Sequence, residues 1–188
     1  SFVLGGGVWG EQGIAEAGTR DTLVLEGTTI NTDYWTNGYH NLAVVHESNT
    51  SSTADIEGKS LTFADGGAAG WIWAGYTEGS GTVSGNTLTI TGGTLHFGAE
   101  VGYSKTGKVE NNRLTISGDA SIADVLGGET ETGSVSGNQV TILAGSVGSA
   151  KGGYAGFGGM VTGNTLKIEG GQMGTANGGG SETNGRRA

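Results

Sequence analysis

The chain has 188 residues, of which 41 are glycine, none is proline or cysteine, and only 14% are charged, which is unusual for a compact globular domain. Its 18 acidic and 9 basic residues give a formal net charge of −9, which argues against nucleic acid and anionic membranes as partners, because both bind basic surfaces. The absence of cysteine excludes disulfides and thiolate metal ligands.

Residues 1–53 are the least regular part of the sequence. The chain opens on "SFVLGGGVWG", without a basic, apolar signal sequence, so we expect a mature or excised segment. The whole chain contains no apolar run long enough to cross a membrane as a helix. The stretch "DTLVLEG" at 21–27 predicts an early strand, and the polar stretch 31–53 reads as an insertion. We therefore expect residues 1–53 to form the first turn or turns of the fold, an insertion and a cap.

One eight-residue phrase dominates residues 54–174. It reads "VSGNTLTI" at 83–90 and returns every 26 residues, with a weaker copy, "IEGKSLTF", at 56–63. The four regular copies begin at Val83, Val109, Val135 and Val161. In the first copy Leu88 and Ile90 lie two residues apart, which predicts a strand with one buried face. A period of this length is typical of solenoids, in which one repeat forms one turn, or rung, of a stack.

The chain must turn inside each phrase, because the leading valine lies five residues before the leucine and would otherwise face the opposite side. A pair ending in asparagine occupies this point in each regular copy, and we expect the pair to adopt the left-handed conformation of a sharp corner. The structural corner residues are Asn86, Asn112, Asn138 and Asn164. Stacked one above another, their amides should hydrogen-bond along the stack.

Further corners are expected at Gly92–Gly93 and Gly75–Tyr76 and at their equivalents in later copies. We therefore predict an all-β fold, a right-handed parallel β-helix of about six rungs, with the hand taken from the usual rule for parallel crossovers. Register must be kept, because a slip of one residue would turn the apolar side chains outward. Residues 175–188 read as a flexible polar tail or linker.

The runs "GTVSGNTLTITGGTLHFGAEVGYS" and "GSVSGNQVTILAGSVGSAKGGYAGFGGMVTGNTLKIEGG" resemble the glycine-rich repeats in passenger regions of bacterial autotransporter-type surface proteins and haemagglutinin-like adhesins. The resemblance covers about residues 54–174. It implies a parallel β-helix displayed outside the outer membrane, at the bacterial cell surface or secreted, where it acts in adhesion or as a stalk.

No catalytic residues emerge from the sequence. Glu57 and Glu110 occupy matching corner positions two rungs apart, with no further acid or base beside them, so we expect no enzyme activity. The three histidines show no metal-ligand spacing, and we expect no metal and no cofactor. Ice binding is a weak alternative, because Arg113 and Lys167 interrupt the outward threonines.

Aromatic residues are the one feature that could mark a partner site. Trp71 and Trp73 alternate along one face with Tyr76 following, and Trp35 and Tyr39 lie in the insertion. Exposed rings could stack on sugars or anchor a protein interface. Alternatively, Trp71 and Trp73 fill the wide lumen of an early rung or lie beneath a cap. Both interpretations stay open.

The sequence thus predicts an extracellular structural or adhesive solenoid of a bacterial surface protein. We expect it to bind a host or neighbouring cell through a protein or glycan ligand, or to act as a stalk. An alternative is a subunit of an extracellular fibre, or filament, that assembles end to end through open solenoid edges. Carbohydrate-active catalysis and ice binding rank below these.

Overall fold

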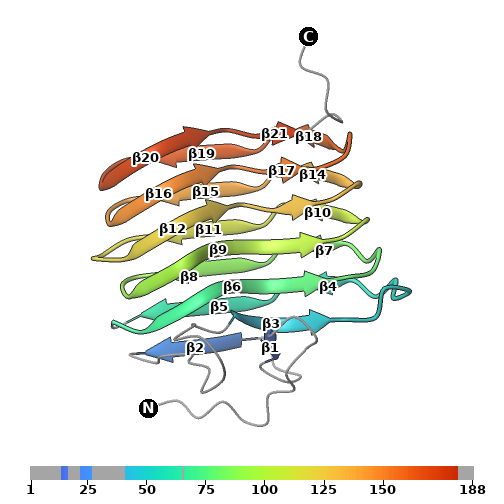
Figure 1. Ribbon diagram of the computed structural model, residues 1–188, viewed down its shortest axis with the longest axis horizontal. Helices are drawn as coiled ribbons and strands as arrows, with labels where there is room; N and C mark the ends of the chain where they lie inside the picture. Colours follow the sequence, from blue (N-terminus) through green and yellow to red (C-terminus); the bar gives the residue numbers. More distant parts are fainter. Residues whose placement is uncertain (1–13, 17–21, 27–40, 65, 182–188) are drawn as a thin grey trace.

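A computed structural model describes residues 14–16, 22–26, 41–64 and 66–181. These residues form strands and turns with no helix, and every strand pairing between rungs is parallel. Figure 1 shows successive rungs lying above one another in chain order, from β2 and β3 at the bottom to β20 and β21 at the top. The predicted parallel β-solenoid and its 26-residue period are confirmed, and its hand stays a prediction.

Three sheets run along the stack. The six-stranded sheet contains β2 (Thr22–Glu26), β5 (Ser60–Ala64), β8 (Thr87–Ile90), β11 (Arg113–Ile116), β15 (Gln139–Ile142) and β19 (Thr165–Ile168). The five-stranded sheet contains β4 (Ile56–Glu57), β7 (Val83–Ser84), β10 (Lys108–Glu110), β14 (Ser134–Ser136) and β18 (Met160–Thr162).

The third sheet, called here the long sheet, has ten strands. Its main path runs through β1 (Ile14–Glu16), β3 (Asn41–Glu47), β6 (Ala68–Thr77), β9 (Thr94–Ser104), β12 (Ser121–Leu126), β16 (Ser146–Lys151) and β20 (Gln172–Asn177). The later rungs add the short strands β13 (Glu129–Thr130), β17 (Tyr154–Ala155) and β21 (Gly180–Ser181). The six-stranded sheet thus supplies one strand for each predicted rung.

The core consists of apolar columns that run along the stack. Leu88 pairs with Leu114 in the next rung, and Ile90 pairs with Ile116, as the 26-residue offset predicts. All four side chains are fully buried. Because the apolar residues of one rung pack directly on those of the next, each added rung covers the rung before it.

Both ends of the repeat extend beyond its clearest sequence signal. Leu23 of β2 pairs with Leu61 of β5, so the 38-residue offset accommodates the insertion between two neighbouring strands of the same sheet. At the other end, residues 175–181, expected in the tail, still pair through β20 and β21 with β16 and β17. Glycine and small polar residues weaken the apolar pattern there, although the backbone continues the stack.

The corner inside each phrase differs from the prediction in one respect. The left-handed conformation is taken by the first residue of the pair, for example Gly85 at φ 62°, Asn111 at φ 57° and Gly137 at φ 65°. The second residue does not share it: Asn86, Asn112 and Asn138 are buried instead. One residue with positive φ is enough to turn the chain at this corner, which allows the asparagine side chain to point inward.

The predicted asparagine stack is confirmed as a continuous ladder. The Asn86 backbone N–H and Nδ2 both donate to Oδ1 of Asn112, each at 3.0 Å. The second Nδ2 hydrogen bond of Asn112 runs back to the carbonyl of Val83 at 3.0 Å. Asn138 and Asn164 repeat this arrangement. Each amide therefore connects its own rung to the rungs on both sides.

Another corner lies within the long sheet. Ala74 packs in the lumen core, yet a Cβ placed on the next residue, Gly75, would lie 2.6 Å from Cγ2 of Ile56. Two consecutive residues thus face inward, which requires a bend in the strand. Gly102 and Gly128 repeat this close approach against Val83 and Val109. The glycine column allows the long sheet to pack against the five-stranded sheet.

We expect Asn112→Val to lower the free energy of unfolding by about 3 kcal/mol, because it leaves buried donors of Asn86 and the carbonyl of Val83 without partners. Urea unfolding followed by circular dichroism measures this change. The control is Asn111→Gly, at the exposed position with positive φ, which should change stability by less than about 1 kcal/mol. Equal stabilities of the two variants would contradict the structural role of the ladder.

Candidate functional site

The outer side of the long sheet carries a cluster of aromatic and acidic side chains, called here the aromatic face. It consists of Trp71, Trp73, Tyr76, Glu100 and Tyr103. Register brings these residues together, because Trp73 of β6 pairs with Glu100 of β9 and Tyr76 pairs with Tyr103. The aromatic rings pack in a cluster separate from the lumen core, so Trp71 and Trp73 lie outside the lumen.

Ring contacts connect the aromatic face across two rungs. Trp71 stacks on Trp73 with centroids 5.8 Å apart, and Tyr76 stacks on Tyr103 at 4.5 Å. Trp73 meets Tyr76 edge to face at 5.0 Å, which joins the two pairs. Such arrangements are favourable contacts between aromatic quadrupoles. The cluster therefore holds its members in fixed positions.

The residues of the aromatic face differ in their exposure to solvent. Trp73 is 6% exposed, and both tyrosines are similarly buried, whereas Trp71 is only half-buried. Of the candidate contact residues Trp71, Trp73 and Tyr76, only Trp71 offers substantial ring surface to a partner. Trp35 and Tyr39, the other two candidates, lie outside the described residues.

Glu100 is the least expected member, because a carboxyl group is seldom buried without full pairing. It is 3% exposed. Its Oε2 accepts a hydrogen bond from Nε1 of Trp73 at 2.9 Å, whereas Oε1 has no hydrogen-bond partner. Burial, reinforced by the charge of Glu129, raises the pKa of Glu100 well above its ordinary value of 4.5. Burial therefore favours the protonated form of Glu100, which the hydrogen bond from Trp73 opposes in part.

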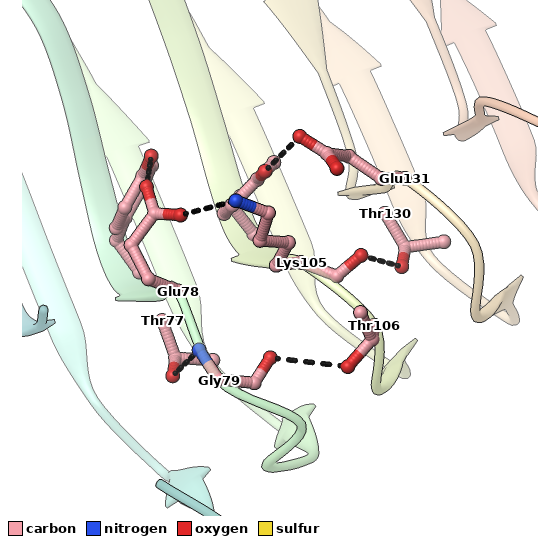
Figure 2. A network of polar contacts seen from close by, with 9 residues as sticks. Thr77, Glu78, Gly79, Lys105, Thr106, Thr130 and Glu131 are labelled. Carbon is pink, nitrogen blue, oxygen red and sulfur yellow. Dashed lines mark hydrogen bonds and ion pairs between the residues drawn. The ribbon is translucent and has the colours of Figure 1, made fainter. Parts of the chain in front are cut away.

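A polar network borders the aromatic face. The hydroxyl of Tyr76 donates to Glu78 at 2.5 Å, and that of Tyr103 donates to Glu131 at 3.2 Å. Figure 2 shows Lys105 between Glu78 and Glu131, with its ammonium group directed at Glu78, 3.4 Å away. Burial is the main cause that raises the pKa of both phenols, so they remain donors at neutral pH. The network fixes the outer ends of the stacked tyrosines.

A β-bulge lies beside Trp71. β9 has one more residue than β6 and β12 between Leu95 and Gly98, and the register shifts there on both sides. The bulge leaves Phe97 49% exposed. Bulges commonly re-aim side chains next to functional sites. Here the bulge places an exposed ring beside the residue that pairs with Trp71.

The other sequence candidates form no comparable site. Glu57 and Glu110 align through Ser84, whose hydroxyl donates to Glu57 at 3.3 Å, as their corner positions predict. His46 packs against Tyr76, and burial lowers its pKa below 6.5. Within the described residues no group of three or more His, Cys, Asp or Glu side chains is arranged to hold a metal ion. The same residues include no helix long and apolar enough to span a membrane.

Sequence reasoning found the tryptophans and missed the residues that surround them. Glu100, Tyr103 and Phe97 belong to the site, and the first two could have been found by adding 27 residues, the offset between the phrases at 56–63 and 83–90, to Trp73 and Tyr76. Phe97 carries no such signal, because the bulge breaks the period at that point.

A comparison with known proteins found no matching family model, no matching curated protein and no matching solved structure. The arrangement of the described side chains is therefore what supports a functional proposal.

Glu100 should make stability depend on pH. Because the folded state raises its pKa above 4.5, its contribution is fully present below about pH 4.5 and is lost as the pH rises through the folded value. Glu100→Gln mimics the protonated group and cannot ionise. We expect the free energy of unfolding of wild type minus that of Glu100→Gln to fall between about pH 4.5 and pH 8.

Urea unfolding of both proteins at the two pH values measures this difference. His46 is present in both proteins, so its own titration largely cancels. A difference that stays constant across this range would show that Glu100 ionises as an ordinary exposed carboxylate.

Proposed function

We propose that this chain is a structural and adhesive segment of a bacterial surface protein, displayed outside the cell, with no catalytic role. One observation carries the proposal: the lumen columns and the asparagine ladder run without interruption from β8 to β19, while the outward residues differ from rung to rung. A uniform interior with a variable exterior suits a protein that presents surfaces along its length. The resemblance to autotransporter passengers and haemagglutinin-like adhesins supports the same role.

The stack also suits a stalk. Rungs lie about 4.8 Å apart, so length grows in proportion to the number of repeats, and each rung needs only its neighbours for stability. The buried amides tie each rung to the next, and a rod built in this way resists bending and slippage. Stalk and adhesive surface are compatible roles of one such rod.

The adhesive role is tested with beads coated with the folded chain. We expect beads coated with the folded wild-type chain to attach to epithelial or bacterial cells at least about threefold more often than beads coated with unfolded Asn112→Val. This variant is unfolded above its unfolding midpoint, and attachment needs the ordered outer face. Equal attachment would contradict the adhesive role. Release of new reducing or unsaturated ends from pectin, alginate, glucan or chitin would contradict the non-catalytic role.

A second candidate function, end-to-end assembly, is supported by the rung that contains β18 and β19. Ile168 is 42% exposed, whereas its counterpart Ile142 in the previous rung is 1% exposed. Among the described residues β19 pairs with β15 alone, so no described strand covers its other edge. A hollow lined by Val161, Asn164 and Gly178–Gly180 lies at the same level. Open strand edges of this kind invite another strand.

The assembly candidate predicts reversible association of the purified chain. Ile168→Lys should weaken self-association at least about tenfold, because it places a charge on the apolar edge. The matched control is Thr165→Lys at an exposed position of the same strand, which should associate like wild type. Sedimentation across a range of concentrations distinguishes them. A wild-type chain that stays monomeric at every concentration would exclude assembly through this edge.

A further inference from the structure

The bulge in β9 creates an accessible aromatic surface on an otherwise packed sheet. Phe97 is 49% exposed, and Trp71 of the neighbouring rung is half-buried. Gly98, which follows Phe97, pairs with Trp71. A Cβ on Gly98 would come within 2.5 Å of Cζ3 of Trp71, so the indole lies over the space that a side chain would fill. Phe97 therefore directly precedes the residue that the Trp71 ring covers.

Contacts with buried residues of the aromatic face hold Trp71 in place. Its indole stacks on Trp73 with an interplanar angle of 20°, and Nε1 of Trp73 donates to Glu100. Its backbone N–H donates to Oδ1 of Asn41 at 2.8 Å. A ring fixed in this way loses little conformational entropy when it meets a ligand, which favours tight contact. Trp73 and Glu100 act as positioning residues for Trp71.

A polar group lies one rung from this surface. Asp124 of β12 pairs with Gly98, and strands of neighbouring rungs are about 4.8 Å apart. Oδ1 of Asp124 accepts a hydrogen bond from the Ser149 hydroxyl. This hydrogen bond engages Oδ1 and not Oδ2. A carboxylate acceptor thus lies one rung from the strand of Phe97 and two rungs from the strand of Trp71.

This combination matches the chemistry of a sugar ring, which has an apolar C–H face and hydroxyl groups along its edge. The C–H face packs on aromatic rings, and a carboxylate accepts hydrogen bonds from the hydroxyls. Charge restricts the sugar further. Asp124 and the net charge of −9 disfavour sulfated or uronic acid polymers, because like charges repel at close range.

We propose that Trp71, Phe97 and Asp124 form a binding site for a neutral hexose-based glycan on the outer face of the long sheet. Trp71 and Phe97 supply the surface on which the sugar ring lies, and Asp124 accepts hydrogen bonds from its hydroxyls. This proposal rests on the adhesive role proposed above. It makes that role more specific, because it names the class of ligand on the surface of the other cell. Binding itself is independent of where the protein is displayed.

Titration calorimetry with cellohexaose, laminarihexaose and chitohexaose tests the site, with a heparin hexasaccharide as the anionic probe. We expect the wild-type chain to bind at least one neutral probe and to bind the anionic probe more weakly. Trp71→Ala should weaken binding at least about tenfold, and Asp124→Asn about threefold or more, in proportion to the contacts removed.

The matched control is Phe157→Ala. Phe157 is 65% exposed and precedes β18, away from the bulge, so its removal should change affinity by less than about twofold. Unfolding midpoints of all variants verify that each remains folded. Failure of the wild-type chain to bind any neutral probe, or equal losses in Trp71→Ala and Phe157→Ala, overturns the site.

The adhesive role and the glycan site fail separately. Cell attachment by beads without oligosaccharide binding overturns the glycan site and leaves the adhesive role intact. Oligosaccharide binding without cell attachment overturns the adhesive role and supports the site.

Discussion

Register between rungs is the constraint on which the whole protein depends. A rung cannot bury its apolar residues by itself, and it does so only when its Leu and Ile side chains stand directly on those of the next rung. The asparagine ladder enforces this alignment, because Oδ1 of Asn112 accepts from both nitrogens of Asn86 only in one register. A displaced rung would leave those donors buried and unsatisfied, at a cost of about 1–3 kcal/mol for each group.

The same constraint organises the outer surface. Because the backbone of every rung repeats, outward residues also form columns, and the side chain at one position lies beside its counterpart one rung away. Trp73 therefore lies beside Glu100, and Tyr76 beside Tyr103. Inward columns require apolar side chains of similar size in every rung, whereas an outward column accepts any side chain for which the neighbouring residues leave room. The side chains therefore vary more from rung to rung on the outside of the stack than in the lumen.

The sequence predicted those features that follow from periodicity. The two-residue spacing of Leu88 and Ile90 identified the strand, and the return of asparagine at the position of Asn112 in each repeat identified the ladder. It assigned the left-handed conformation to both members of each pair, although only the first adopts it, because glycine and asparagine both tolerate that conformation and only the inward hydrogen bonds of the second residue distinguish them. The bulge at Phe97 was missed because the strands were predicted from periodicity, and an added residue departs from the period.

The residues that stabilise the stack and the residues of the aromatic face lie on different parts of each rung, and this separation explains how the fold accommodates Glu100. A buried carboxyl with an unpaired oxygen is unfavourable wherever it lies. Inside the lumen it would interrupt an apolar column and weaken two rung interfaces. On the outer face it contacts Trp73 and costs only local stability, while the ladder and the lumen columns remain intact. The outer face of a solenoid can therefore hold strained or polar groups in fixed positions without loss of register.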